Sequence, residues 1–318
     1  MVLIEKLILQ GVQMAAVLLL APLLVGIARK TKARLLRRQG ASLFQPYREL
    51  LRLLRKTPVI AENASWLFRG APCLILAFTW LAASLVPTFT TGLVFGRAVD
   101  LIAIVALLAS ARFLLALAGM DIGTSFGGIG SSREMMISTL AEPAMMMIVF
   151  TLALIAGSTQ LSVISDYIAS TSVGLRVSLG LALVALMIVA LAENARIPVD
   201  NPATHLELTM VHEAMVLEYS GRHLAMIELA AAVKLLLYVS LISCIFVPWG
   251  FAQAGDNWEA YVLAEVFYLG KLAISGGLLA LFETSIAKMR VFRVPDFLNV
   301  ALMMSLLATL LLFVSERF

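Results

Sequence analysis

Long apolar runs are the feature that most constrains how this chain can fold. Eight of them occur, near residues 3–28, 69–90, 98–119, 136–157, 174–195, 224–248, 260–284 and 297–315. Each is close to the roughly 20 residues that a helix needs to cross the hydrocarbon core of a bilayer. Unpaired backbone groups are costly in lipid, and the alternating pattern of a membrane β-barrel is absent from the sequence, so the spanning elements must be helices. The sequence therefore predicts an all-α polytopic membrane protein, a bundle of about eight transmembrane helices.

The composition agrees with this prediction. Of 318 residues, 61% are hydrophobic and 14% are charged, and the mean hydropathy is +0.96, far above that of a water-soluble domain. No internal repeat, low-complexity tract or linker divides the chain, so we expect one integral membrane domain over residues 1–318. The first run begins MVLIEKLILQ, without the basic stretch of a secretory signal, so we expect a membrane helix there and not a cleaved leader.

Lys and Arg residues are distributed unequally between the two sets of loops. Most of those outside the apolar runs lie after the first, third, fifth and seventh runs, and the loop after the first run carries the largest group. Positively charged loops of membrane proteins stay on the cytoplasmic side. We therefore expect both termini to lie on the non-cytoplasmic side of the membrane.

Neither the cysteines nor the histidines form a metal-binding pattern. Cys73 and Cys244 lie in separate apolar runs, so the chain has no CxxC pair and no disulfide framework. His205 and His212 are seven residues apart and lack the H-E-x-x-H arrangement, in which two histidines one turn apart flank a base. We expect no metal and no cofactor in this chain, so any redox metal must belong to a partner.

The loop after the first run contains RKTKARLLRRQGASLFQPYRELLRLLRK, which predicts a basic amphipathic helix. Its apolar side is formed by Leu43, Tyr47, Leu50, Leu51 and Leu54, opposite Arg48, Arg52 and Arg55. Such a helix anchors a protein to anionic lipid headgroups or docks a cytoplasmic partner. Nucleic-acid binding is disfavoured, because the basic residues are interleaved with aliphatic ones and no nucleic-acid module surrounds them.

Ionisable residues inside the apolar runs are the main functional signal. They are Arg112, Glu142, Glu193, Glu228, Lys234, Glu265, Lys271 and Glu283. Groups of this kind are costly at bilayer depth unless they are paired or hydrated. One interpretation is that oppositely charged pairs hold the bundle together. The other is that the carboxylates form a proton path, since a desolvated carboxylate takes up and releases a proton near neutral pH.

The segment AENARIPVDNPATHLELTMVHEAMVLEYSG, residues 192–221, interrupts the apolar pattern. Pro198 and Pro202 should end the helix after Glu193, and we expect it to restart at about Ala203. Further on, Glu207 and Glu218 are 11 residues apart, which places them on one face of such a helix.

The segment 192–221 also contains Glu213 and His212. Glu213 falls off the face shared by the other two acids, and the neighbouring His212 is either a proton relay or a polar residue that faces water.

The glycine-rich stretch GMDIGTSFGGIGSSREMM, residues 119–136, follows a membrane helix and not a β-strand. The geometry of a phosphate-binding loop is therefore missing, and we expect a flexible cytoplasmic turn.

Three cytoplasmic stretches in order carry a family resemblance: RRQGASLFQPYRELLRLLRK, SSREMMISTLAEP, and AENARIPVD followed by EYSG. With them the chain resembles the membrane subunit of respiratory complex I that closes the quinone chamber, and the related subunits of energy-converting nickel–iron hydrogenases. The resemblance implies a tilted eight-helix bundle in which acidic residues begin a proton path to antiporter-like subunits.

Individual positions match the family's motifs. Glu142 stands nine residues after Arg133, and AENARIPVD supplies Glu193, Arg196 and Asp200. The later acids of the loop correspond to Glu207 and Glu218, whereas Glu228 does not align cleanly with the family's next glutamate.

Other segments favour the hydrogenase branch, of the formate hydrogenlyase and hydrogenase-4 types. Gly40-Ala41-Ser42 replaces the G-P-N turn usual in complex I, and both the glycine-rich stretch and DNPATHLEL are closer to the hydrogenase branch.

These considerations give two predicted sets of site residues, neither of them catalytic. The proton path comprises Glu142, Glu193, Asp200, Glu207, Glu213, Glu218, Glu228 and Lys234. Docking of the redox module is assigned to Arg34, Arg37, Arg38, Arg133 and Arg196.

The resemblance also implies the setting. We expect a non-catalytic subunit in a bacterial or archaeal cytoplasmic membrane, with lipid, antiporter-like subunits and the hydrogenase large and small iron–sulfur subunits as partners. A nickel–iron centre and iron–sulfur clusters would belong to those partners, and no nucleic acid is expected. The alternatives are a quinone-site subunit of an NADH–quinone oxidoreductase, a stand-alone ion transporter, or an anchor without ion traffic. The choice between H⁺ and Na⁺ stays open.

Overall fold

The computed structural model describes residues 2–90, 93–94, 100–170, 177–200, 211–252, 255, 257–287, 289 and 293–315. This part of the chain contains helices and no strand. The helices are α1 (Val2–Leu35), α2 (Gln45–Leu54), α3 (Trp66–Leu85), α4 (Leu101–Asp121), α5 (Ser125–Ala156), α6 (Leu161–Ser170), α7 (Val177–Glu193), α8 (His212–Val216), α9 (Gly221–Phe246), α10 (Trp258–Ser285) and α11 (Val294–Ser315).

The predicted fold class is confirmed. Among the described residues, seven helices are long and apolar enough to cross a membrane, namely α1, α3, α4, α5, α9, α10 and α11. The shorter apolar helix α7 accounts for the remaining predicted run. The chain is an all-α polytopic membrane protein.

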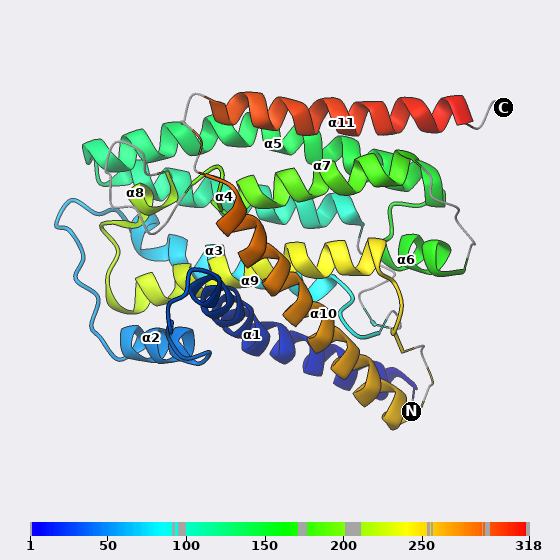
Figure 1. Cartoon of the computed structure of the whole chain (residues 1–318). Helices are drawn as coiled ribbons and strands as arrows, with labels where there is room; N and C mark the ends of the chain where they lie inside the picture. Colours follow the sequence, from blue (N-terminus) through cyan, green and yellow to red (C-terminus); the bar gives the residue numbers. More distant parts are fainter. Residues whose placement is uncertain are drawn as a thin grey trace.

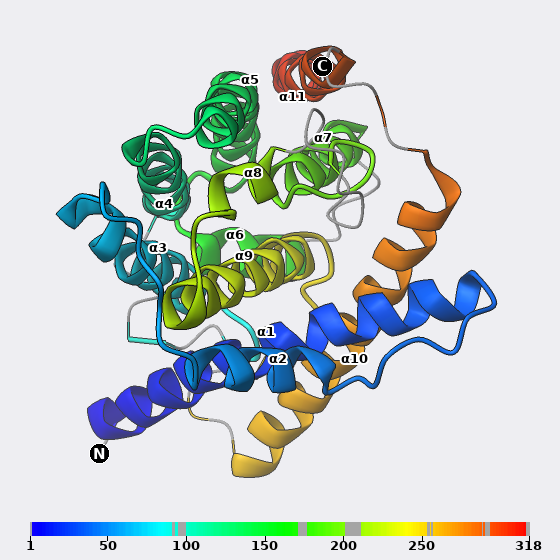
Figure 2. The same ribbon diagram turned by 90° about the vertical axis from the view of Figure 1, so that its left-hand side faces the viewer.

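Helix α9 occupies the middle of the bundle (Figure 2). It packs against α1, α2 and α3 on one side and against α7 on the other, while α11 lies along α5 and α7 (Figure 1). Its side chains Leu236, Leu237 and Leu241 are fully buried. Helix α10 packs mainly on α1 and turns most of its surface outward, as a lipid-facing helix does.

The prediction of a flexible turn over residues 119–136 is wrong. Helix α4 continues to Asp121, and α5 begins at Ser125, where the Thr124 side chain accepts a hydrogen bond from the Gly127 N–H over 3.3 Å. The glycines serve close packing within helices: a Cβ on Gly130 would lie 2.9 Å from the Val211 carbonyl oxygen. Because Gly130 has no side chain, α8 can pack closely against α5.

The predicted amphipathic helix exists as α2, but its two apolar edges face different surroundings. Pro46 and Leu53 are buried, whereas Leu51 and Leu54 are exposed next to exposed arginines. The helix packs on α1 and α9 through its buried edge. Its other edge remains available to lipid or to a partner.

The chain breaks after α7 as the prolines predict. Helix α7 ends at Glu193, and the Ile197–Pro198 peptide is cis. The expected restart at Ala203, and with it Glu207, lies outside the described residues. The helix described beyond that point, α8, ends at Val216, so Glu218 lies in an exposed turn and not on a helix face as predicted.

Candidate functional site

A buried arginine collects three carboxylates inside the bundle. Arg112, near the middle of α4, places its Nε 3.6 Å from Glu134 and its Nη1 3.5 Å from Glu142, both on α5. Its Nη2 contacts Glu193 at the end of α7. A buried guanidinium is stable only when such partners replace its water shell.

Lys234 on α9 extends this group, with its Nζ 4.0 Å from the second oxygen of Glu193. We call Arg112, Glu134, Glu142, Glu193 and Lys234 the Arg112 cluster. Among the described residues, three carboxylates face two cations when every member is ionised, which leaves one negative charge without a counterpart in this group. One added proton would balance these formal charges.

Most of the Arg112 cluster is buried, although the Glu142 side chain keeps 40% of its surface exposed. Ser138, one turn before Glu142 on α5, donates a hydrogen bond to that carboxylate. Arg112, Glu142, Glu193 and Tyr238 also line a cavity of about 10 Å³. This is close to the smallest space that holds one water molecule.

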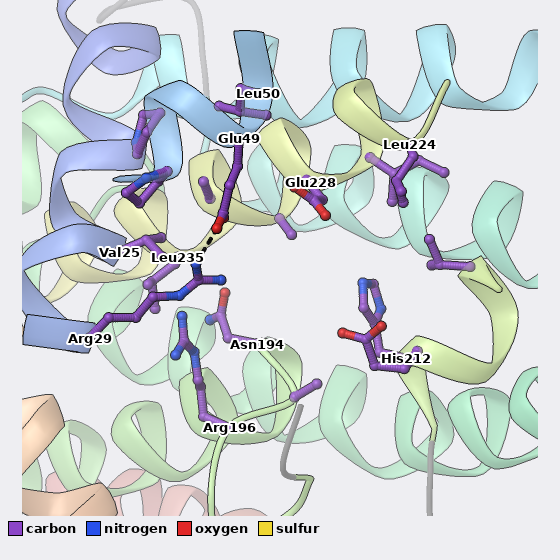
Figure 3. A pocket seen from close by; sticks show the side chains of 18 of the residues that line it. Val25, Arg29, Glu49, Leu50, Asn194, Arg196, His212, Leu224, Glu228 and Leu235 are labelled. Carbon is purple, nitrogen blue, oxygen red and sulfur yellow. Dashed lines mark hydrogen bonds and ion pairs between the residues drawn. The ribbon is translucent and has the colours of Figure 1, made fainter. Parts of the chain in front are cut away.

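A larger cavity of about 210 Å³ opens beside the cluster. Its wall comes from α1, α2, the segment 194–200, α8 and α9. Figure 3 shows Arg29, Glu49, Arg196, His212 and Glu228 around this space, with Arg29 and Glu49 paired at 3.2 Å. The cavity is large enough to hold several water molecules.

His212 lines the large cavity, and the charges that act on it include Lys234 and Glu134 of the Arg112 cluster. Burial lowers the pKa of His212 below its ordinary 6.5, and the charge of Lys234 lowers it further, while Glu134, Glu213 and Asp200 act in the opposite direction. The imidazole is therefore neutral at pH 7. A neutral imidazole has one donor and one acceptor nitrogen and can relay a proton.

A second ion-pair group fixes the segment 194–200. Glu283 on α10 is buried and accepts hydrogen bonds from Lys32 Nζ at 2.7 Å and from Arg196 Nη1 at 3.3 Å. Burial lowers the pKa of Arg196, and the charge of Glu283 opposes that shift. The Met289 N–H also donates to the Pro198 carbonyl over 2.9 Å. Segment 194–200 is thus tied to both α1 and α10.

The structure divides the predicted proton-path residues into groups. Glu142, Glu193 and Lys234 meet at Arg112. At the large cavity lie Asp200, Glu213 and Glu228. Glu218 is exposed and apart from both groups, and Glu207 is outside the described residues.

The predicted docking residues also separate. Arg34, Arg37 and Arg38 are exposed at the end of α1 and in the turn after it. Arg133 is half-buried on α5, and Arg196 points into the cavity wall, where it pairs with Glu283.

Sequence reasoning missed Glu134 as a site residue. Because the helix was expected to begin near residue 136, this glutamate was assigned to a turn. With α5 beginning at Ser125, residues 134, 138 and 142 follow one another at four-residue spacing on one face. That spacing was available in the sequence.

Comparison with known proteins identifies the family. A family described as NADH dehydrogenase matches residues 9–314. The chain belongs to the NADH dehydrogenase family. Within this family, it is 33% identical over 287 residues to formate hydrogenlyase subunit 4 of Escherichia coli K12, covering 89% of this chain and 91% of that protein.

Two further known proteins are similar to the chain. The chain is 34% identical over 241 residues to hydrogenase-4 component C of the same organism, covering 76% of this chain and 75% of the other. The structure of a membrane-bound sulfane sulfur reductase, an archaeal respiratory membrane complex, contains a chain that matches with a TM-score of 0.80 at 21% identity, over 97% and 98% of the two chains. The names of the two E. coli proteins describe a subunit and a component, and the archaeal structure shows that the fold is shared.

Proposed function

We propose that this chain is the membrane-anchor subunit of a complex-I-like nickel–iron hydrogenase and links electron transfer in a docked redox module to proton translocation. The E. coli relatives at 33% and 34% identity are named for formate hydrogenlyase and hydrogenase-4, whereas the wheat NADH-ubiquinone oxidoreductase chain 1 is 28% identical. In this proposal the chain is non-catalytic, and the nickel–iron centre and iron–sulfur clusters belong to its partners.

The unmatched charge of the Arg112 cluster is the observation that carries the proposal. An anchor without ion traffic needs only balanced pairs, because an unpaired buried charge is strongly unfavourable. Three carboxylates on two cations instead create a place where one proton is bound and released. The adjacent 210 Å³ cavity supplies room for the water that delivers it.

Docking of the redox module would use the exposed basic end of α1, at Arg34, Arg37 and Arg38. A change of charge in the docked module then acts on the segment 194–200, which lines the large cavity and is held by the Arg196–Glu283 pair. Coupling between the docked module and the proton site requires an element with two arrangements. The balance between these arrangements must depend on the state of each site, and the segment 194–200 is our candidate for this element. Antiporter-like subunits in the membrane would receive the displacement.

The basic loops support an orientation in which both termini lie on the non-cytoplasmic side of a bacterial or archaeal cytoplasmic membrane. The transported ion is H⁺ in this proposal, since protonation balances the charge of the Arg112 cluster. If turnover required Na⁺, the transported ion would be Na⁺ and not H⁺, and the proposed site would be the same.

The first test is mass spectrometry of the subunits that copurify with the tagged chain in mild detergent. A nickel–iron large subunit with small iron–sulfur proteins is the expected result. Recovery of NADH-dehydrogenase modules would assign the chain to complex I, and ion uptake by the chain reconstituted without partners would make it a transporter. In the purified complex, Glu193→Gln and Glu142→Gln should each reduce proton translocation; full turnover and full translocation in both would disprove the proton path.

A quinone-site subunit is the second candidate. The family match and a cavity bounded by α1, α2 and α9 are the observations that favour it. Sensitivity of the complex to quinone-site inhibitors would support this role, and inhibitor-resistant turnover would exclude it.

A further inference from the structure

Glu134 is the member of the Arg112 cluster whose charge also acts on His212, which lines the large cavity. Its carboxylate is buried, and its Oε1 is 3.6 Å from Arg112 Nε, too far for a hydrogen bond. Arg112 Nε is itself buried without a hydrogen-bond partner among the described residues. Glu134 thus contributes charge to the cluster without being locked to the guanidinium.

Glycines bring α8 and α5 together at this point. A Cβ on Gly130 would lie 2.9 Å from the Val211 carbonyl oxygen and 3.0 Å from the Ala214 Cβ. Val211 directly precedes His212, the first residue of α8. Since Glu134 follows Gly130 by four residues on α5, it lies on the same helix face one turn further along. The packing therefore sets Glu134 beside the start of α8.

Electrostatics agree with this placement. The charged groups that face His212 are Lys234 on α9, Glu134 on α5, Glu213 on α8 and Asp200 in the segment after α7. Glu134 also interacts with Lys234, whose ammonium approaches Glu193. Among these acids, Glu134 is the member of the Arg112 cluster that also acts on the imidazole.

We propose that Glu134 is the carboxylate that passes protons between His212 at the large cavity and the Arg112 cluster. This inference rests on the proposed function. One imidazole nitrogen takes a proton from a hydronium ion in the cavity, which leaves a neutral water, and the other nitrogen loses its N–H proton to a Glu134 oxygen, so the ring ends as the opposite neutral tautomer. The O–H bond of Glu134 then breaks as the proton moves on to another carboxylate of the cluster.

The test uses the intact complex in proteoliposomes, with redox turnover, proton translocation and its pH profile measured together. Glu134→Gln should lower translocation by about tenfold or more, since a positioned proton-transfer group contributes at least this much. Glu259→Gln, at the exposed start of α10, is the matched control and should behave as wild type.

Glu134→Asp separates proton transfer from packing. Aspartate is shorter but keeps a carboxylate, whereas glutamine keeps the size and loses the titrating group. Partial rescue by Asp and not by Gln supports the proposal, and better function with Gln than with Asp overturns it. A shifted pH profile in the Asp variant is expected as well, because the carboxylate is displaced.

The two proposals fail differently. Normal translocation in Glu134→Gln together with loss in Glu193→Gln overturns the role of Glu134 and leaves the proposed function intact. Normal translocation in both variants overturns the proposed function. If Glu134→Gln does not assemble, His212→Gln provides the same test, and full translocation by an assembled His212→Gln complex overturns the inference.

Discussion

Lys32 and Glu283, 251 residues apart in the sequence, are joined by a 2.7 Å hydrogen bond between the ends of α1 and α10. Arg196 reaches the other oxygen of the same carboxylate at 3.3 Å. One buried acid therefore holds two helices and the segment that lines the large cavity. The basic end of α1, the proposed docking surface, is thereby linked directly to the candidate site.

Removing the charge of Glu283 should destabilise this junction. In Glu283→Gln two cations lose their partner, and we expect a loss of about 1–3 kcal/mol, less than for a fully buried pair because Lys32 is partly exposed to screening. Thermal unfolding of the purified chain in detergent should show a melting temperature several degrees lower. Glu259→Gln is the control, and an unchanged melting temperature for both variants would mean that the junction contributes nothing.

The close approach of α8 to α5 can be tested with two neighbouring glycines. Gly130→Ala should force α8 away from the helix and cost about 1–3 kcal/mol, because the new methyl group meets the Val211 carbonyl. Gly128→Ala lies on the same helix with nothing within 4 Å of its Cβ, and it should be neutral or stabilising by up to about 1 kcal/mol. Equal melting temperatures for the two variants would contradict this packing.

The sequence was sufficient for the spans and for part of the site. Hydropathy located the seven described helices that could cross a membrane and the shorter α7, and the charges inside apolar runs drew attention to Glu142 and Glu193, which both contact Arg112. Glu134 was missed because glycines near it suggested a turn, whereas their real role is close helix contact that only tertiary structure reveals. The partner of Glu283 was equally inaccessible, since no local pattern pairs residues so distant in the chain.

The free energy of unfolding should fall at acidic pH, partly because of His212. Burial and Lys234 hold the folded-state pKa of His212 below 6.5, even though Glu134, Glu213 and Asp200 face it. The unfolded state therefore binds more protons as the pH drops below about 6.5, and the stability present above that pH is lost. Melting temperatures of wild type and His212→Gln between about pH 5 and 8 should show a shallower acid decline in the variant. Parallel curves would contradict a depressed pKa.

Arg112 and Glu193 should be strongly coupled in energy because they contact each other in a buried site. Arg112→Gln alone leaves Lys234 as the single cation facing three carboxylates, so it should destabilise the chain more than any other change in the cluster. Adding Glu193→Gln removes one of those carboxylates, and the double variant should recover about 0.5–3 kcal/mol relative to the sum of the single changes. Pairing Arg112→Gln with the distant, neutral control Glu259→Gln should give the loss of Arg112→Gln alone in the same thermal measurement. Additive losses for Arg112→Gln and Glu193→Gln would show that the arginine does not compensate the charge of the glutamate. The cluster could then no longer be treated as one unit.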